Sequence, residues 1–209
     1  MTTTAEDHDL AFLKRVAERG ASAPLLGGRF LLFWGVMVML ADLAHYAVLK
    51  GMIGNGPAAL GIVWSVFGVV GVAGSTVLGR TFPTKAGAGT VGNLVERDVW
   101  RMVGIATGFY VGGAVAAISL GGVGPILMDT IQGVAFLLYA VAFAATGRAA
   151  DVVWFRWASF LSLLLGTGAL TLVGNPNLYL LGAAGVFVVA VVPGALLLMR
   201  EPPVAATDE

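Results

Sequence analysis

Six apolar runs of about 20 residues each alternate with short polar connections between residues 29 and 200. The runs cover roughly residues 30–50, 57–79, 99–120, 125–147, 152–174 and 178–199. A helix of about 20 residues is long enough to cross the ~30 Å hydrocarbon core of a bilayer. The runs occupy well over half of the 209 residues, which leaves little room for a soluble catalytic domain. The sequence therefore predicts an all-α polytopic membrane protein, a bundle of six transmembrane helices.

Lysine and arginine are distributed unevenly around the six runs. Of the 12 such residues, Lys50 alone lies in a connection on the opposite side from the rest. Because positively charged connections stay in the cytoplasm, we expect both termini to be cytoplasmic. The predicted organisation is a cytoplasmic N-terminal segment over residues 1–28, a transmembrane domain over 29–200 and a cytoplasmic tail over 201–209. The short connections favour the bacterial inner membrane as the location.

The composition argues against several functional classes. Charged residues make up 11% of the chain and hydrophobic residues 58%, against about 25% and 45–50% in soluble domains. The zero net charge gives no support to direct nucleic-acid binding, and the lack of cysteine excludes thiolate ligands and disulfides. The runs contain one histidine, no H-E-x-x-H spacing and no nucleophile elbow. We expect no enzymatic activity, no cofactor and no resident metal.

A few strongly polar residues lie within the runs, where an ionisable group is costly and therefore suggests a functional site. Asp42, His45 and Tyr46 share one face of the first run, and Asp129 and Gln132 repeat the three-residue spacing in the fourth. The helical rise places the first two about 18 and 22 Å above the inner surface, and the last two about 6 and 10 Å below the outer surface. If the two runs are neighbours, these residues form one polar cluster open to the periplasm.

Three interpretations of this cluster remain open. In the structural one, Asp42 and His45 satisfy each other and Asp129 caps the fourth helix. In the second, the cluster is a proton- or ligand-responsive site, because histidine titrates near neutrality. The third is a catalytic or metal site, since one histidine and two carboxylates could in principle ligate zinc.

Glycines recur at helical spacing in two of the runs. Those of the second run are Gly68, Gly71 and Gly74, and those of the third are Gly104, Gly108 and Gly112. In lipid, small residues let helices approach closely, so we expect these two runs at the bundle centre with tight crossings. A homodimer seam along the third run is the alternative. In the sixth run Pro193 removes a helical hydrogen bond, so we expect a kink there and a possible hinge.

Two cytoplasmic segments are candidates for contact with lipid or with a protein partner. Residues 9–19 form a short amphipathic pattern with Lys14, Arg15 and Arg19 largely on its polar face, typical of a helix in the headgroup layer. The connection 80–98 carries Lys85 and Arg97. Within it, Asn93 followed by Glu96 resembles a capping box, which predicts that the third helix begins near Leu94.

Three stretches, APLLGGRF at 23–30, VGNLVERDVW at 91–100 and VPGALLLMREPP at 192–203, carry a resemblance to known sequences. They resemble an uncharacterised bacterial family of six-helix inner-membrane proteins of similar length. The resemblance covers the whole chain in layout and implies no activity or site residue. An association of such proteins with helix-turn-helix regulators would favour a sensing or regulatory role.

The functional prediction is a non-enzymatic inner-membrane protein that acts as a regulatory, sensory or accessory component. Protonation of His45 would change the charge of the polar cluster and bias the packing of the first and fourth runs. Expected partners are the lipid bilayer, a cytoplasmic or membrane protein and a second copy of the chain. The alternative is a small proton-coupled transporter or channel. Against it stands the lack of an inverted repeat, because Asp42 and Asp129 lie about 12 and 4 residues from their helix starts.

Overall fold

The computed structural model describes residues 10–11, 24–54, 56–80 and 87–201, and in these ranges the chain is helical without strands. The helices are α2 (Gly28–Leu49), α3 (Gly56–Gly79), α4 (Val91–Gly121), the short η1 (Pro125–Asp129), α5 (Thr130–Ala149) and α6 (Trp154–Thr171), followed by α7 (Asn177–Val186), η2 (Phe187–Val191) and α8 (Val192–Met199). The last three form one continuous helix, Asn177–Met199. The prediction of an all-helical fold is confirmed for the described residues.

Five of the helices are long and apolar enough to cross a membrane. They are Gly28–Leu49, Gly56–Gly79, Val91–Gly121, Pro125–Ala149 and Asn177–Met199. Each coincides with one of the six expected runs. The remaining run corresponds to α6, which has 18 residues and is not among the five.

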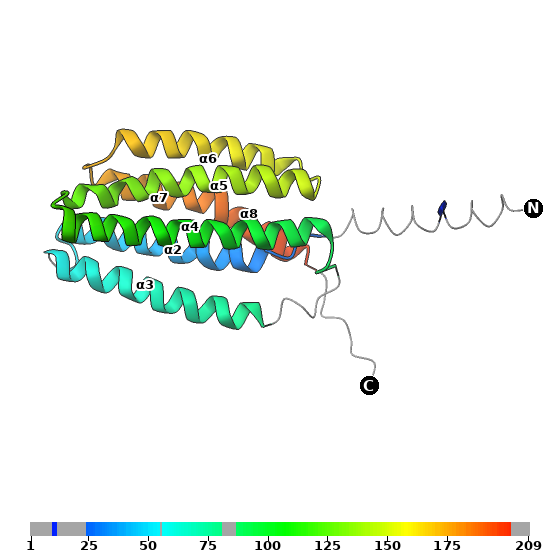
Figure 1. Ribbon diagram of the computed structural model, residues 1–209, viewed down its shortest axis with the longest axis horizontal. Coiled ribbons are helices and arrows are strands. Elements are labelled where there is room, and N and C mark those ends of the chain that lie inside the picture. Colours follow the sequence, from blue (N-terminus) through cyan, green and yellow to red (C-terminus); the bar gives the residue numbers. More distant parts are fainter. Residues whose placement is uncertain (1–9, 12–23, 55, 81–86, 202–209) are drawn as a thin grey trace, which may run out of the picture.

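The helices run alternately up and down in one elongated bundle (Figure 1). Helix α2 packs on α3, α7, η2 and α8, whereas α5 packs on α6 and α4. Large apolar side chains fill the space between these helices, and Phe136, Phe143 and Phe155 are at most 1% exposed. Helices α2, α5, α6 and α7–α8 therefore surround the core, and α3 and α4 flank it.

The expectation that the second and third runs lie at the bundle centre does not hold within one chain. In the most apolar stretches of α3 and α4, 6% and 11% of residues are buried, against 50% in Asn177–Met199. Gly71 and Gly74 of α3 lie against the rings of Trp34 and Phe33 on α2. By contrast, Gly68, Gly104, Gly108 and Gly112 have nothing within 4 Å of the position of an added Cβ. The homodimer seam along α4 stays a prediction.

The closest helix crossings use glycines that the sequence analysis did not single out. On α2 and α8, a Cβ on Gly28 would lie 2.7 Å from the Leu198 nitrogen, and one on Gly194 would lie 2.8 Å from the Leu32 Cα. Helices α5 and α6 meet in the same way at Gly133 and Gly166. Small residues permit two helices to approach closely, but their spacing in the sequence does not identify the helix that packs against them.

The helix at the C-terminal end of the bundle is interrupted where the sequence predicts a kink. Pro193 is buried near the start of α8, and the five residues before that helix, Phe187–Val191, form a π-helical segment. Proline has no N–H to give to the carbonyl four residues earlier, and π-helical turns are a usual way to absorb such a gap. A hinge motion at this position stays a prediction.

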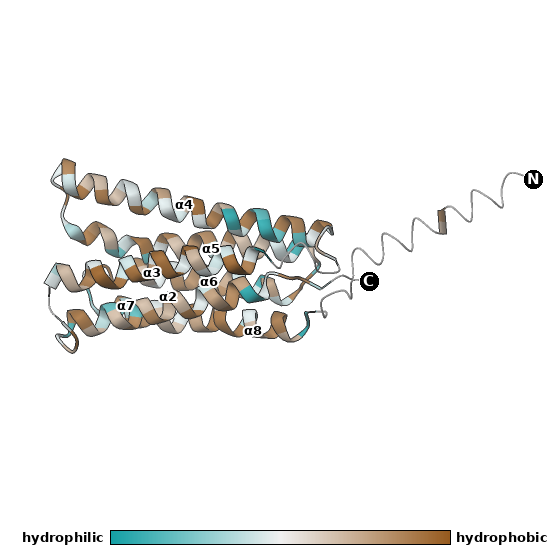
Figure 2. Ribbon diagram, turned by 90° about the horizontal axis from the view of Figure 1, so that it is seen from below, coloured by the Kyte–Doolittle hydropathy of each residue, from teal (hydrophilic) through white to brown (hydrophobic). Residues whose placement is uncertain are grey.

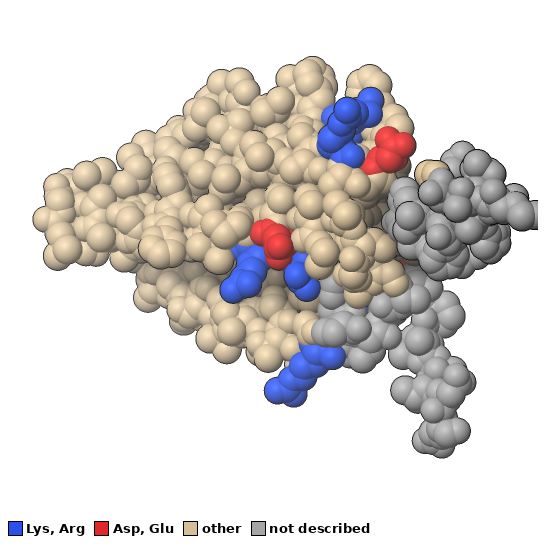
Figure 3. All heavy atoms as spheres, turned by 45° about the vertical axis from the view of Figure 1, so that its right-hand side comes forward, with Lys and Arg blue, Asp and Glu red and all other residues tan. Residues whose placement is uncertain are grey.

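Seven of the eight described basic residues lie at one end of the bundle, which we call the basic end. It holds the start of α2 and the end of α8, and its described basic residues are Arg29, Arg80, Arg97, Arg101, Arg148, Arg156 and Arg200. Several of these side chains reach the surface (Figure 3). The hydrophilic residues of α4 lie toward the same end, and the rest of the bundle is predominantly hydrophobic (Figure 2). Lys50 lies at the opposite end, after α2.

Candidate functional site

Asp42 and Gln132 form a buried polar contact between α2 and α5. The Asp42 side chain is fully buried, and Gln132 is 7% exposed. Gln132 Nε2 donates a hydrogen bond to Asp42 Oδ1 at 2.5 Å, and Asp42 Oδ2 has no hydrogen-bond partner. Gly182 of α7 borders the pair: a Cβ there would lie 2.5 Å from Asp42 Oδ2 and 2.9 Å from Gln132 Oε1. The polar pair fits because this position carries no side chain.

His45 lies one turn further along α2 and faces two other helices. Trp64 Nε1 on α3 donates a hydrogen bond to His45 Nδ1 at 3.1 Å. The imidazole stacks on the ring of Tyr179 from α7, with centroids 3.6 Å apart and an interplanar angle of 23°. Because Nδ1 accepts a hydrogen bond, a neutral His45 carries its proton on Nε2.

Asp129 completes the polar arrangement from the end of η1. It accepts hydrogen bonds from Tyr179 Oη at 2.6 Å and from the backbone N–H of Gly174 at 2.8 Å. It occupies the N-cap position of α5 but makes no capping hydrogen bond through its side chain. Asp129 therefore joins η1 to α7 and to the connection before α7.

The contacts differ from the structural interpretation of the sequence. Asp42 and His45 do not pair with each other, since Asp42 takes Gln132 and His45 takes Trp64 and Tyr179 as partners. An aspartate and a histidine three residues apart share a helix face, but here both border α7, and Asp42 bonds to α5 whereas His45 bonds to α3. The structure brings Asp42 to Gln132 directly, and it connects His45 to Asp129 through Tyr179.

Tyr46 lies beside this arrangement rather than within it. Its ring is half-buried against the cluster of Ala169, Leu178 and Tyr179, and Lys50 Nζ lies 5.6 Å from its centroid. Two residues that sequence reasoning did not include, Trp64 and Tyr179, supply the contacts of His45. Their signal in the sequence is a polar atom on an aromatic ring, the indole of Trp64 within the second run and the phenol of Tyr179 at the start of the sixth, because such an atom needs a partner when buried.

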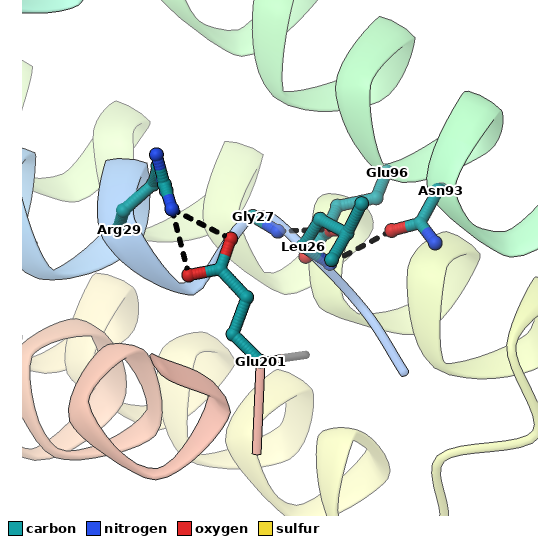
Figure 4. Close-up of polar contacts among 6 residues, drawn as sticks. All are labelled: Leu26, Gly27, Arg29, Asn93, Glu96 and Glu201. Atoms are coloured by element: carbon teal, nitrogen blue, oxygen red, sulfur yellow. Dashed lines mark hydrogen bonds and ion pairs between the residues drawn. The ribbon is translucent and has the colours of Figure 1, made fainter. Parts of the chain in front are cut away.

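A second polar cluster lies at the basic end, where α4 holds the chain that leads into α2 (Figure 4). The backbone N–H of Leu26 donates to Asn93 Oδ1 at 2.8 Å, and the N–H of Gly27 donates to Glu96 Oε2 at 2.8 Å. Asn93 Nδ2 donates in turn to the Pro24 carbonyl at 3.0 Å. Both acceptor side chains are at most 3% exposed.

This geometry overturns the capping-box interpretation of Asn93 and Glu96. Helix α4 begins at Val91, with Thr90 at its N-cap position and no side-chain capping hydrogen bond. The two side chains serve the backbone before α2, which is about 70 residues away in sequence. Nearby, Arg29 and Glu201 form an ion pair at 2.9 Å that ties the start of α2 to the end of α8 (Figure 4).

The residues expected to contact lipid or a cytoplasmic partner lie mostly outside the described ranges. These are Lys14, Arg15, Arg19 and Lys85, together with most of the amphipathic segment at 9–19. Arg97 is described: it lies on the exposed side of α4, where its Nε contacts Asp98 Oδ1 at 3.4 Å. Contact of these residues with a partner stays a prediction.

Comparisons with family models, curated proteins and solved structures found no match to this chain.

Proposed function

We propose that the chain is a multi-pass protein of the bacterial inner membrane, with six spans and both termini in the cytoplasm. Five apolar helices of sufficient length support membrane insertion. Insertion with the basic end in the cytoplasm agrees with the distribution of arginine, since positive charge is retained on that side. This orientation puts Asp42, His45 and Asp129 in the outer half of the membrane.

The proposed role is that of a non-enzymatic sensory or regulatory component, in which His45 controls how α3 is held. The observation that carries this proposal is the hydrogen bond from Trp64 Nε1 to His45 Nδ1. An indole N–H can only donate, and a protonated imidazole has no acceptor nitrogen. Protonation of His45 at Nδ1 therefore breaks this bond, and the two N–H groups then face each other.

The packing of α3 makes this one contact important. Helix α3 packs on α2, and no other described helix makes an extensive contact with it. Its remaining described contacts with α2 are apolar: Gly71 against Trp34, Gly74 against Phe33, and the rings of Trp34 and Phe67 at 5.5 Å. Loss of the polar contact would thus loosen α3 without unfolding the core formed by the other helices.

The surroundings of His45 contain both groups that would oppose a positive charge and one that would favour it. Tyr179 stacks on the imidazole and donates its hydroxyl hydrogen to Asp129, and the Asp129 carboxylate acts on His45 through space. Asp42 lies one turn earlier on α2, and α3 contributes the neutral Trp64. Burial and the Trp64 N–H oppose a charged His45, whereas the Asp129 carboxylate beyond Tyr179 favours it, and a responsive site requires such opposed effects.

The test measures the separation of α2 and α3 as a function of pH. The chain contains no cysteine, so spin labels on Leu40→Cys and Val66→Cys, both more than half exposed, report this distance without background. In liposomes we expect the distance to increase on acidification in the otherwise wild-type chain. The His45→Gln variant keeps a neutral acceptor for Trp64 and should hold the short distance at every pH. An equal response in both proteins would refute the proposal.

A small proton-coupled transporter is the second candidate, and the interrupted helix supports it. Helices that depart from regular geometry near the membrane interior are typical of transporter binding sites, and the π-helical segment Phe187–Val191 before Pro193 is such a departure within an otherwise continuous helix. Proton flux into liposomes distinguishes the two functions. Flux that disappears in Asp42→Asn would favour transport, and a tight membrane with a moving α3 would favour sensing.

A further inference from the structure

The Asp42 carboxyl group has fewer partners than an ionised carboxylate requires. It is fully buried, it receives one hydrogen bond from Gln132, and its Oδ2 atom has none. Buried charges in proteins are normally paired or saturated with hydrogen bonds. An ionised Asp42 would leave one charged oxygen unsatisfied in the interior of the bundle.

The Gln132 amide offers the complement of a protonated carboxyl group. Its Nε2 donates to Asp42 Oδ1, and its Oε1 faces the same small space beside Gly182 as Asp42 Oδ2. Two acceptor oxygens that share a buried space repel each other unless a hydrogen lies between them. A protonated carboxyl group supplies that hydrogen, because it is both a donor and an acceptor.

We propose that Asp42 is a proton-binding site, in which the proton resides on Oδ2 and is donated to Gln132 Oε1. The acid and the amide then form two antiparallel hydrogen bonds between α2 and α5. The step is a simple protonation: the carboxylate takes up one proton from water and no other bond changes. Loss of the proton leaves two facing acceptors, which drives α2 away from α5 and α7.

The neighbouring groups do not supply a positive charge that would favour the ionised form. Tyr139 on α5 and Tyr179 on α7 are the titratable side chains on which the charge of Asp42 acts, and both are neutral near pH 7. His45, on the same helix, directs its ring toward Trp64 and Tyr179. Asp129 lies beyond Tyr179, from whose hydroxyl it accepts a hydrogen bond.

This site involves different atoms from the His45 contact and does not rest on the proposed sensory function. It places a proton where α2, α5 and α7 meet, whereas His45 controls α3. A chain with both features can bind protons at two positions with separate structural consequences.

Infrared spectroscopy of the full-length chain in liposomes tests the assignment. At neutral pH we expect a carboxylic acid carbonyl band that shifts on exchange into D₂O and is lost in Asp42→Asn. Asparagine reproduces both hydrogen bonds of the protonated acid, so this variant should fold. The matched control is Glu96→Gln, which alters a buried carboxyl at the basic end and should keep the Asp42 band.

A second variant tests the role of Gln132 and does not depend on the folding of the first. Gln132→Leu removes both partners and should move the Asp42 band to higher frequency. An unchanged acid band in Asp42→Asn, or an unmoved band in Gln132→Leu, would overturn the proposal. His45→Gln should leave the Asp42 carbonyl band in place. The infrared result therefore tests the proton on Asp42 independently of the proposal for His45.

Discussion

Replacement of Asn93 by alanine should destabilise the bundle from its basic end. Asn93 is fully buried and accepts a hydrogen bond from the backbone N–H of Leu26. Leu26 is itself only 1% exposed. Asn93 also donates to the carbonyls of Pro24 and Gly87, each at 3.0 Å. Alanine leaves a buried backbone donor unsatisfied, which costs about 1–3 kcal/mol, and removes two further hydrogen bonds of about 1 kcal/mol each. Because water can replace part of this loss, we expect a decrease of about 3 kcal/mol in the free energy of unfolding.

Denaturant unfolding in mixed micelles, followed by helical circular dichroism, measures this decrease. The matched control is Asn177→Ala, the same chemical change at an exposed position at the start of α7, for which we expect less than about 0.5 kcal/mol. Hydrogen exchange over residues 24–30 adds a local measurement: the amides of Leu26 and Gly27 should exchange faster in Asn93→Ala only. If Asn93→Ala unfolds at the same denaturant concentration as the wild type and its amides are equally protected, the hydrogen bonds from Asn93 to the backbone before α2 do not stabilise the bundle.

Three further predictions concern packing and the outer polar contacts. Gly194→Val should lower the free energy of unfolding by about 2 kcal/mol or more, because overpacking of a close helix crossing is costly. The control Gly108→Val should be tolerated, because a Cβ at this position has nothing within 4 Å. Thermal unfolding in detergent compares the two variants. Tyr179→Phe removes the hydroxyl that donates to Asp129 and should cost about 1–2 kcal/mol, with faster amide exchange in the connection before α7, and unchanged exchange there would contradict the contact. Phe143→Ala, at a fully buried core position, should cost about 3–5 kcal/mol, and a loss below 1 kcal/mol in the same unfolding assay would argue against the packed core.

The positions of the helices could be predicted from the sequence because apolar run length is a strong signal. The packing faces could not. In a soluble helix an apolar stripe marks the buried side, but α3 and α4 are apolar on both their packed and their exposed sides. The glycines of α4 recur every four residues, a spacing typical of a crossing, whereas Gly28 and Gly194, which do form one, belong to no such repeat.

The polar residues were found by the sequence, whereas most of their partners were not. Asp42 and Gln132 were expected at overlapping depth, and depth alone could bring them together. The partners of His45 come from α3 and α7, whose rotation around their axes is not encoded in a periodic pattern. The spacing of Asn93 and Glu96 predicts a cap on their own helix, because local capping is common. Their actual acceptor role depends on the path of the backbone before α2, which only the tertiary fold determines.

The most direct measurement of the state of His45 is the ¹⁵N spectrum of its ring, recorded with the chain in liposomes. The chain contains 2 histidines, so selective ¹⁵N-histidine labelling of the wild type and of His45→Gln identifies the two ring signals of His45. We expect a neutral ring protonated on Nε2, with the Nδ1 signal shifted by the hydrogen bond from Trp64 and that shift lost in Trp64→Phe. Acidification should convert both nitrogens to the protonated form while the Trp64 indole signal moves with them. A ring protonated on Nδ1, or an indole signal that does not respond to the protonation of His45, would contradict the proposal for His45.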